Sequence, residues 1–211
     1  MKNFFYKVND KEYEVEVIYK RIRKIYYRFK NGKFVITCSR LVSKNQLLEG
    51  LNKYGADLIK RASKDNGIGK DYIYLFGEKY IINNSGLIRF KDYPEIKYSN
   101  HEELLKKLKP IYLDIITKRT RYYESLMGLP SYRVSVRKMT TRHGSNSKRT
   151  KHITFAMHLL HYSIDIIDSV IVHELAHILV YDHSKEFYDV VYKYYPNYKE
   201  CHTKLRKGEF K

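Results

Sequence analysis

Residues 163–179 read SIDIIDSVIVHELAHIL and predict a single buried helix. Ser163 can cap this helix with its hydroxyl, and Asp165 adds a negative charge near the positive end of the helix dipole. Apolar residues follow on nearly every side: Ile164, Ile166, Ile167, Val170, Ile171, Leu175, Ile178 and Leu179. A helix that is apolar all round is expected to lie inside the protein.

Three ionisable residues interrupt this apolar helix, in the order His173-Glu174-Leu-Ala-His177. Two histidines four residues apart are separated by one helical turn plus about 40°, so both imidazoles project from one face and can share a metal ion. Burying them together with a carboxylate costs several kcal/mol unless they are paired or bound to metal. A metal site therefore explains the pattern better than a set of hydrogen-bonded core residues.

A third protein ligand is expected just beyond this helix, because catalytic zinc usually takes three protein ligands and keeps one position for water. His183 lies on a turn before a further helix that should begin at Ser184, and its imidazole can swing back over His173 and His177. Glu186 is a weaker alternative. The other six histidines lack metal-ligand spacing: His101, His143, His152, His158, His161 and His202.

Glu174 follows the first histidine, at a place where its carboxylate faces the fourth metal position instead of binding the metal. That place suits a general base, since a metal lowers the pKa of its bound water towards about 7 and Glu174 can take the proton. The resulting hydroxide attacks a polarised carbonyl, and the same carboxylate can protonate the leaving amine. The expected cofactor is Zn²⁺, with another divalent metal as the alternative.

The residues after about 99 predict mainly helices around this segment. Asn100 can cap a helix in which Pro110 should produce a kink or a restart. Short extended segments are expected over 132–158, around a polar loop from Thr140 to Lys151. The helix from Ser184 has an apolar stripe that consists of Phe187, Val190, Val191 and Tyr194.

The residues before about 99 predict β-structure with one helix. Strand patterns over 26–29 and 34–37 flank Asn31-Gly32, a dipeptide that favours a tight hairpin turn. Residues 43–62 carry apolar side chains at helical spacing, and the pattern over 72–82 resembles a second hairpin.

The chain has 211 residues and a formal charge of +18, from 41 Lys and Arg against 23 Asp and Glu. A hydrophobic content of 43% is enough to bury a core, which argues against a disordered chain. So large a positive charge fits a polyanionic partner. A composition biased towards Lys, Ile, Tyr and Asn explains the charge equally well.

Cysteine usage and the absence of long apolar runs predict a cytoplasmic protein. Cys38 and Cys201 stand far apart without a CxxC pair, which excludes a disulfide framework and a cysteine zinc ribbon. Residues 1–17 lack the apolar run of a signal peptide, and no uncharged apolar stretch of about 18 residues is present to span a membrane. We therefore expect a reducing compartment and no membrane partner.

Two segments concentrate the positive charge. Residues 20–33 hold seven basic residues and no acidic one, interleaved with Tyr26, Tyr27 and Phe29, and residues 131–151 hold seven more. Basic and aromatic residues together can hold phosphates and stack on bases. If both segments line one groove beside the metal, a nucleic acid or a nucleotide becomes a natural ligand. A solvated strand face is the equally favoured alternative.

Residues 137–201 resemble the YgjP-like metallopeptidase family, which is related to SprT-like and WLM proteins among the zincins. The family pattern R-W-G-S-C reads RHGSN over residues 142–146. The helix motif V-V-H-E-L-A-H reads IVHELAH over 171–177, and N-H-S followed by a phenylalanine reads DHSKEF over 182–187. The N-terminal half resembles the family more loosely, so the resemblance spans most of the chain.

This resemblance implies an α+β fold: a zincin-like metallopeptidase core with an N-terminal, mostly antiparallel β-sheet region. We expect a β-rich region with one helix over residues 1–98 and the metal-binding catalytic region over 99–211, within one continuous family unit. The resemblance also implies a zinc ion on His173, His177 and His183, beside Glu174 as the catalytic acid and base.

The chain departs from the family pattern at three aromatic or polar positions. His143 and Asn146 stand where the family has tryptophan and cysteine, and Tyr188 replaces a second frequent tryptophan. These changes spare the metal site. They bear on the Arg142 loop, which either packs under the metal helix or contacts substrate.

We therefore expect a zinc-dependent metallopeptidase of the HExxH type, acting on a peptide or protein and associated with nucleic acid as SprT-like relatives suggest. Two alternatives stay open. One is a metal-dependent nucleoside triphosphate pyrophosphatase whose basic segments clamp phosphates, and the other is a nucleic-acid-binding module with a structural metal. No spacing selects the residue that would stabilise the oxyanion.

Overall fold

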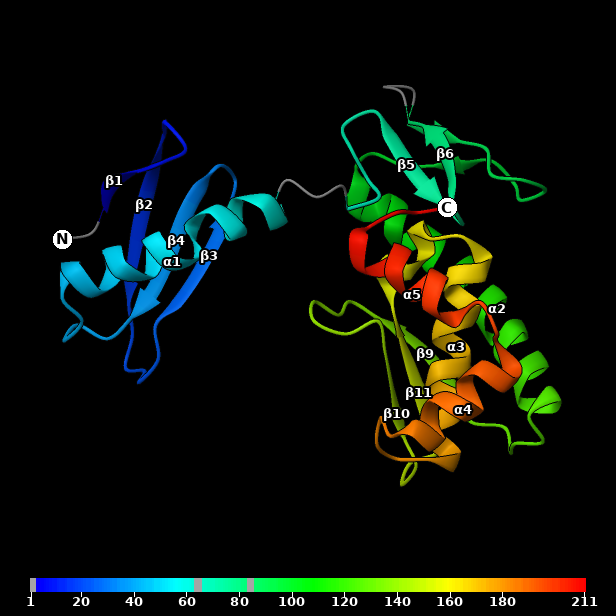
Figure 1. Ribbon diagram of the computed structural model, residues 1–211. Coiled ribbons are helices and arrows are strands. Elements are labelled where there is room, and N and C mark those ends of the chain that lie inside the picture. Colours follow the sequence, from blue (N-terminus) through cyan, green and yellow to red (C-terminus); the bar gives the residue numbers. More distant parts are fainter. Residues whose placement is uncertain (1–2, 63–65, 83–85) are drawn as a thin grey trace. The chain divides into compact units, whose positions relative to one another are not determined.

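The structure is a computed structural model that describes residues 3–62, 66–82 and 86–211. It divides into two compact units, Met1–Lys64 and Asp65–Lys211, and each has a hydrophobic core of its own (Figure 1). The mixture of helices and sheets is the predicted α+β class. Within the described residues, no helix combines the length and the apolar content that crossing a bilayer requires.

Unit 1 is a four-stranded sheet covered by one helix, in the strand order β1-β2-β4-β3. Its elements are β1 Asn3–Val8, β2 Lys11–Tyr19, β3 Tyr26–Lys30, β4 Lys33–Cys38 and α1 Lys44–Ala62. The two outer pairings are antiparallel and the central β2–β4 pairing is parallel. Alternate strand residues turn inward and meet Leu47 and Leu51 of α1: Val15, Val17, Phe34 and Ile36.

Local sequence signals fix the ends of these elements. Asn31 and Gly32 both have positive φ, of 51° and 77°, as the tight turn of the predicted β3–β4 hairpin requires. Ser43 and Gln46 form a reciprocal cap at the start of α1. The Ser43 hydroxyl accepts from the Gln46 N–H at 3.3 Å, and the Gln46 side chain accepts from the Ser43 N–H at 2.9 Å.

Unit 2 is built around one central helix, α3. Its elements are β5 Tyr72–Leu75, β6 Glu78–Ile81, β7 Leu87–Ile88, β8 Ile96–Lys97, α2 His101–Leu126, β9 Arg133–Arg137, β10 Gly144–Ser147, β11 His152–Ala156, the 3₁₀ helix Met157–His161, α3 Ile164–Leu179, α4 Lys185–Tyr194 and α5 Tyr198–Lys207. Helix α3 packs against α2, α4, α5 and β10 (Figure 1). The Ser163 hydroxyl caps it as predicted, although Leu179 at its far end is 50% exposed.

A three-stranded sheet in the order β10-β11-β9 lies against α3, and β10 is an edge strand. Strand β10 pairs antiparallel with β11, whereas β9 pairs parallel with it. The expected loop from Thr140 to Lys151 is therefore wrong over residues 144–147. Gly-Ser-Asn-Ser has no apolar alternation, so the strand depends on backbone pairing with β11 and on contacts with α3 instead.

Two helices differ from the sequence expectation. Helix α2, capped by the Asn100 side chain at 2.9 Å from the Glu103 nitrogen, runs through Pro110 as one element without a restart. Pro110 and Lys106 are both exposed, so water can satisfy the carbonyl that loses its hydrogen bond to the proline. Helix α5 has no counterpart among the predicted elements.

The compact units divide at 64/65 rather than at the 98/99 boundary expected from the change in pattern. The predicted hairpin over 72–82 does form, as β5 and β6, but Ile73 and Leu75 are buried in the same core as α2 and α3. A local change from strand to helix patterns cannot reveal this packing.

Candidate metal centre

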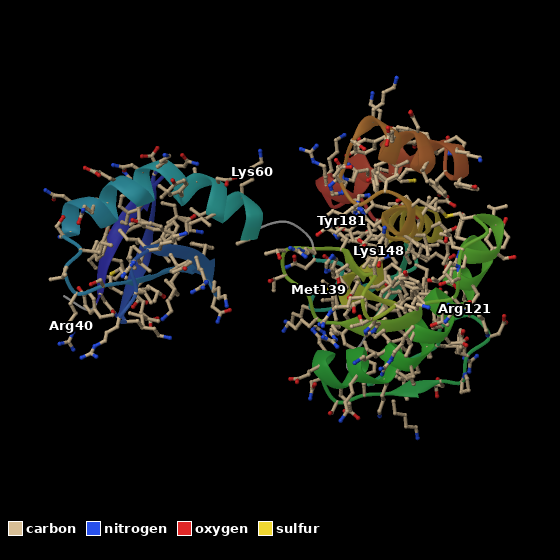
Figure 2. All side chains as sticks on the ribbon, turned by 90° about the horizontal axis from the view of Figure 1, so that it is seen from below. Arg40, Lys60, Arg121, Met139, Lys148 and Tyr181 are labelled. Carbon is tan, nitrogen blue, oxygen red and sulfur yellow. The ribbon has the colours of Figure 1, made fainter. Side chains whose placement is uncertain are left out.

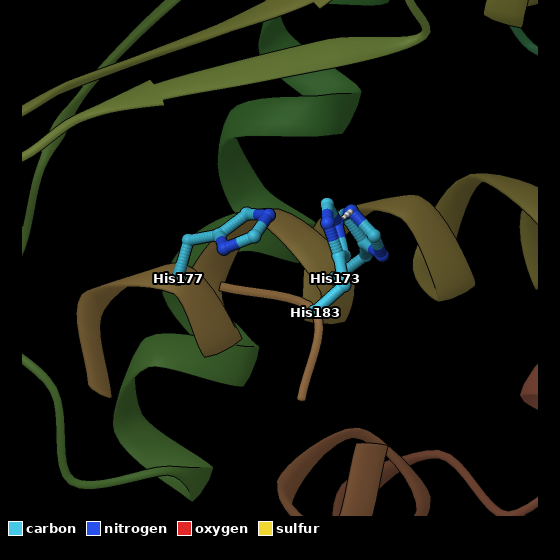
Figure 3. Close-up of side chains that lie close together, drawn as sticks. All are labelled: His173, His177 and His183. Atoms are coloured by element: carbon cyan, nitrogen blue, oxygen red, sulfur yellow. Dashed lines mark hydrogen bonds between the residues drawn. The ribbon is translucent and has the colours of Figure 1, made fainter. Parts of the chain in front are cut away.

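Three histidines meet at the C-terminal part of α3 and the turn that follows it. His173 and His177 lie on α3, and His183 lies between α3 and α4. One ligand nitrogen from each ring lies within 4.8 Å of the others. The Nε2 atoms of His173 and His183 are 3.2 Å apart (Figure 3). The turn does bring the third imidazole back over the helix.

This cluster fits a zinc ion. Tetrahedral zinc with Zn–N bonds of about 2.0–2.1 Å keeps its ligand nitrogens roughly 3.3 Å apart, which agrees with the closest pair here. Burial, with the charges of His177 and His183 adding to it, lowers the pKa of His173 to about 3. Burial also lowers the pKa of His177. Both rings are therefore neutral at neutral pH, as metal ligation requires.

Hydrogen bonds orient the two helix histidines. The Nδ1 atom of His173 lies 2.9 Å from the Tyr198 hydroxyl, and Nδ1 of His177 donates to the Val180 carbonyl at 3.3 Å. With Nδ1 engaged, Nε2 of His173 is directed towards His183. Such partners fix the tautomer and the ring orientation of metal ligands.

Glu174 is a buried carboxylate beside the cluster, only 6% exposed. No described side chain or backbone group donates a hydrogen bond to its carboxylate. Burial raises its pKa to about 8, against the opposing charge of Arg142. At a pKa of about 8 the carboxyl is mostly protonated at neutral pH, and the positive charge of a bound metal would lower that pKa. A buried acid without a hydrogen-bond donor is uncommon unless it has a chemical task, so Glu174 is a candidate proton acceptor once metal is bound.

Strand β10 lies directly over Glu174. A Cβ built on Gly144 would be 2.6 Å from the Glu174 Oε1 atom, and the Asn146 side chain donates to the Glu174 backbone carbonyl at 2.6 Å. The two parts of the Arg142 loop therefore have different surroundings. Its strand part packs against α3, and Arg142 itself is exposed at the site.

A cleft of about 540 Å³ opens over the histidines and Glu174. Strand β10 and its flanking residues Arg142, His143 and Lys148 line one side, and α3 and α5 line the other with Tyr198 and His202. The cleft is large enough for several residues of a bound peptide.

His143, which lines this cleft, is paired with a second histidine, His158. His143 Nδ1 and His158 Nε2 are 2.7 Å apart. Burial lowers the pKa of His158, against the opposing effect of a hydrogen bond to the Met139 backbone, which marks the ring as the donor to a carbonyl. In the neutral pair, His158 Nε2 then accepts from His143 Nδ1–H, and the Nε2 atom of His143 keeps a lone pair. Burial first, then the charges of His158 and His202, lowers the pKa of His143 to about 4.

The remaining sequence candidates lie elsewhere. Glu186, the weaker alternative to His183, is exposed and does not line the cleft. His101, His152 and His161 are also absent from its lining. The sequence reasoning missed Tyr198, Asn146 and the His143–His158 pair. Only the family motif at 142–146 signalled part of this set, because Tyr198 comes from a helix that was not predicted.

The sequence pattern of a known family extends over almost the whole chain. The family model described as YgjP-like, metallopeptidase domain, matches residues 23–208. The chain belongs to the YgjP-like metallopeptidase family. The predicted resemblance is thereby confirmed, and as a YgjP-like protein the chain is a metal-dependent hydrolase of the peptidase class.

Two solved metallopeptidase zymogens are similar to part of this YgjP-like chain. Abylysin of Pyrococcus abyssi is 21% identical, with a TM-score of 0.40, over 43% of this chain and 90% of that chain. Jannalysin of Methanocaldococcus jannaschii is 17% identical, with a TM-score of 0.41, over 44% of this chain and 95% of that chain. No curated protein matches the chain.

Proposed function

We propose that this protein is a zinc-dependent peptidase whose metal is held by His173, His177 and His183 and whose general base is Glu174. One observation carries the proposal: three imidazole nitrogens within 4.8 Å of one another lie beside a buried carboxylate without a hydrogen-bond donor. A purely structural zinc site is usually closed by four protein ligands. Three ligands at an open cleft favour catalysis instead.

A bound zinc ion would supply an activated water and would polarise the scissile carbonyl. The protein residues do the rest. Tyr198 and the Val180 carbonyl hold the His173 and His177 rings in position. Glu174, at the floor of the cleft, would take the proton from that water and return it to the leaving amine.

The edge of β10 supports an extended peptide as substrate. Ala156 N–H donates to the His143 carbonyl, so residues 143 and 145 bond towards β11 in this antiparallel pair. By the alternation of such pairs, the N–H and C=O groups of Gly144 and Asn146 point to the free edge. A peptide can add to that edge as a further strand, which would lay its backbone across the histidines.

A second candidate is hydrolysis of a nucleoside triphosphate to a monophosphate and pyrophosphate. Arg142 and Lys148 line the cleft, and both can bind phosphate oxygens. Association with nucleic acid has weaker support. The basic segment 20–33 belongs to unit 1 and the segment 131–151 to unit 2, so the two segments do not share one compact unit. The cytoplasmic location stays a proposal, consistent with Cys38 and Cys201 being free thiols.

The test compares the zinc-loaded wild type with Glu174→Gln on an unfolded protein substrate and on nucleoside triphosphates. We expect the variant to keep its zinc and to lose protein hydrolysis by about 10²–10⁴-fold, the range of a lost general base. Glu186→Gln, an exposed acid on α4 outside the cleft, is the matched control and should retain activity. Equal peptidase activity in Glu174→Gln would refute the mechanism, and release of pyrophosphate alone would favour the second candidate.

A further inference from the structure

Two cations flank the edge strand that covers the active site. Arg142 lies two residues before β10, which spans Gly144–Ser147, and Lys148 follows it directly. Both are exposed, and both line the metal cleft. Figure 2 labels Lys148 together with Tyr181, another residue of the cleft. Neither Arg142 nor Lys148 forms a salt bridge with a described residue.

The two cations lie at the two ends of the strand that covers Glu174. Gly144, where an added Cβ would be 2.6 Å from the Glu174 carboxylate, and Asn146, which donates to the Glu174 backbone carbonyl, lie between them in the chain. Arg142 and Lys148 therefore flank the part of β10 that covers the buried acid.

The cleft has few acidic side chains that could neutralise the charges of Arg142 and Lys148. Among the described residues that line it, Glu174 is the one acid, and that acid is buried. The acidic residues around His183 are exposed and lie outside the lining: Asp182, Glu186 and Asp189. The cleft therefore presents two solvated positive charges to whatever binds along β10.

The spacing of the cations matches an extended chain. Lys148 lies six positions after Arg142, with the strand 144–147 between them, so their Cα atoms are at most about 20 Å apart. Glu174 lies opposite the middle of that segment, at Gly144 and Asn146. A peptide paired with β10 would therefore meet one cation about three residues before its reacting bond and the other about three residues after it.

We propose that the cleft selects extended peptides that carry acidic side chains about three residues on either side of the cleaved bond, with Arg142 and Lys148 as the two recognition groups. This inference rests on the proposed peptidase function. Either direction of the peptide along β10 gives the same charge pattern. A triphosphate spans less than half of the distance between the two Cα positions, so it would reach both cations only if both side chains folded inward.

The experiment uses three fluorogenic peptides of one central sequence, with Glu, Gln or Lys at the third position on both sides of the cleaved bond. The measured quantity is kcat/KM for each peptide, and the ratios of the Glu peptide to the Gln peptide and to the Lys peptide give the charge preference. Two solvated ion pairs should favour the Glu peptide over the Gln peptide by about tenfold at low salt, or about threefold for each pair. The preference should vanish near 1 M salt, where the screening length falls to about 3 Å.

The decisive variant is Lys148→Glu, which should invert the preference on one side, so that a peptide with Lys at that position is cleaved best. Lys109→Glu, an exposed lysine of α2 outside the cleft, makes the same charge change and should leave the ratio unaltered. Binding of the same peptides to zinc-loaded Glu174→Gln, measured by fluorescence anisotropy, should show the same order of affinity without turnover.

The outcomes separate the two proposals. Cleavage of all three peptides at one rate, or an unchanged ratio in Lys148→Glu, overturns the inference and leaves the peptidase function intact. Absence of peptide cleavage by the zinc-loaded wild type overturns the peptidase function. If nucleoside triphosphates are then hydrolysed and Lys148→Glu abolishes that hydrolysis, the cations recognise phosphate, and the peptide inference is also wrong.

Discussion

Gly144 leaves the space that the Glu174 carboxylate occupies. The glycine lies on β10 and the acid on α3, and a Cβ at position 144 would be 2.6 Å from Oε1 and 2.8 Å from Cγ of Glu174. Atoms of unbonded groups do not approach so closely, so any larger residue must displace the acid. Glycine at this position is therefore a condition for the present placement of the Glu174 carboxylate.

We predict that Gly144→Ala keeps its zinc but loses about 10²-fold in kcat, because a displacement near 1 Å of a catalytic group can cost that much. Zinc content and turnover of the purified variant measure the two effects. Ser147→Ala, on the same strand, is the control and should be active. Full activity of Gly144→Ala would show that the carboxylate does not need its present position.

The His143–His158 pair makes stability depend on pH. In the folded protein the pKa of His143 is lowered from 6.5 to about 4 by burial, with His158 and His202 adding to the effect. Between these two values the unfolded chain takes up a proton and the folded chain does not. Stability should therefore fall as the pH falls through this window, and be restored as it rises.

The test is His143→Phe, which removes this titration and keeps an aromatic ring. The free energy of unfolding is measured in urea between pH 4 and 7. Its slope against pH should be smaller in the variant than in the wild type, by an amount that corresponds to up to about one proton taken up on unfolding. Other buried histidines will leave a residual slope. An identical slope in His143→Phe would show that the ring is protonated equally in both states.

At the residue scale, sequence reasoning singled out the three histidines that the structure brings together, and missed the residues that support them. The spacing of His173 and His177 follows from the helical repeat, and His183 from the turn before the Ser184 cap. Tyr198 lies 25 residues after His173, and no local pattern joins the two. The His143–His158 contact likewise depends on pairing between β10 and β11.

At the scale of elements, α2 and α3 are joined by an ion pair. Arg119 of α2 makes a two-pronged contact with the Asp168 carboxylate of α3, and the Tyr123 hydroxyl donates to the same carboxylate at 3.1 Å. Asp168 is buried, and burial raises its pKa although Arg119 opposes the shift. The hydrogen bond to Asp168 in turn raises the pKa of Arg119, so the attraction within the pair is opposed by the cost of desolvating the carboxylate, as is common for buried ion pairs.

We predict that Arg119→Met alone destabilises unit 2 by about 2 kcal/mol, because it leaves a buried charge unpaired; the arginine is partly exposed, so the cost is below that of a fully buried pair. Adding Asp168→Asn should recover part of the loss, since no buried charge then remains. Urea unfolding of the single and double variants gives both numbers. Strictly additive losses would show that the two residues do not interact.

The elements that sequence reasoning found have local signals, and those it missed do not. The β3–β4 hairpin and the start of α1 are encoded by the Asn31-Gly32 turn and the Ser43 cap. Strand β10 is entirely polar and forms because β11 and α3 are present. Pro110 indicated a kink or a restart, and of these the restart is wrong, because the exposed position of Pro110 on α2 lets the helix continue.

At the scale of the whole molecule, two separate cores predict two unfolding transitions. The core of unit 1 and the core of unit 2 share no residue. Zinc bound at 100 times its Kd should stabilise unit 2 by about 2.7 kcal/mol and leave unit 1 unchanged. Calorimetry with and without a chelator measures this. A single transition that shifts as a whole would contradict the independence of the two cores.

The fold class could be predicted from the sequence, but the division of the chain could not. Alternating strands, one capped helix and the apolar α3 pattern are enough to predict α+β. The limits of the two units depend on which core receives β5 and β6, and that is decided by contacts with α2 and α3. The same holds for the two basic segments, 20–33 and 131–151. Their charge patterns do not reveal in which unit each segment folds.

X-ray absorption spectroscopy of the zinc-loaded protein tests the central claim most directly. We predict one zinc per chain, with three imidazole nitrogens and one oxygen at about 2.0–2.1 Å, and loss of one imidazole in His183→Ala. A spectrum with sulfur ligands, or one that His183→Ala leaves unchanged, would contradict the account.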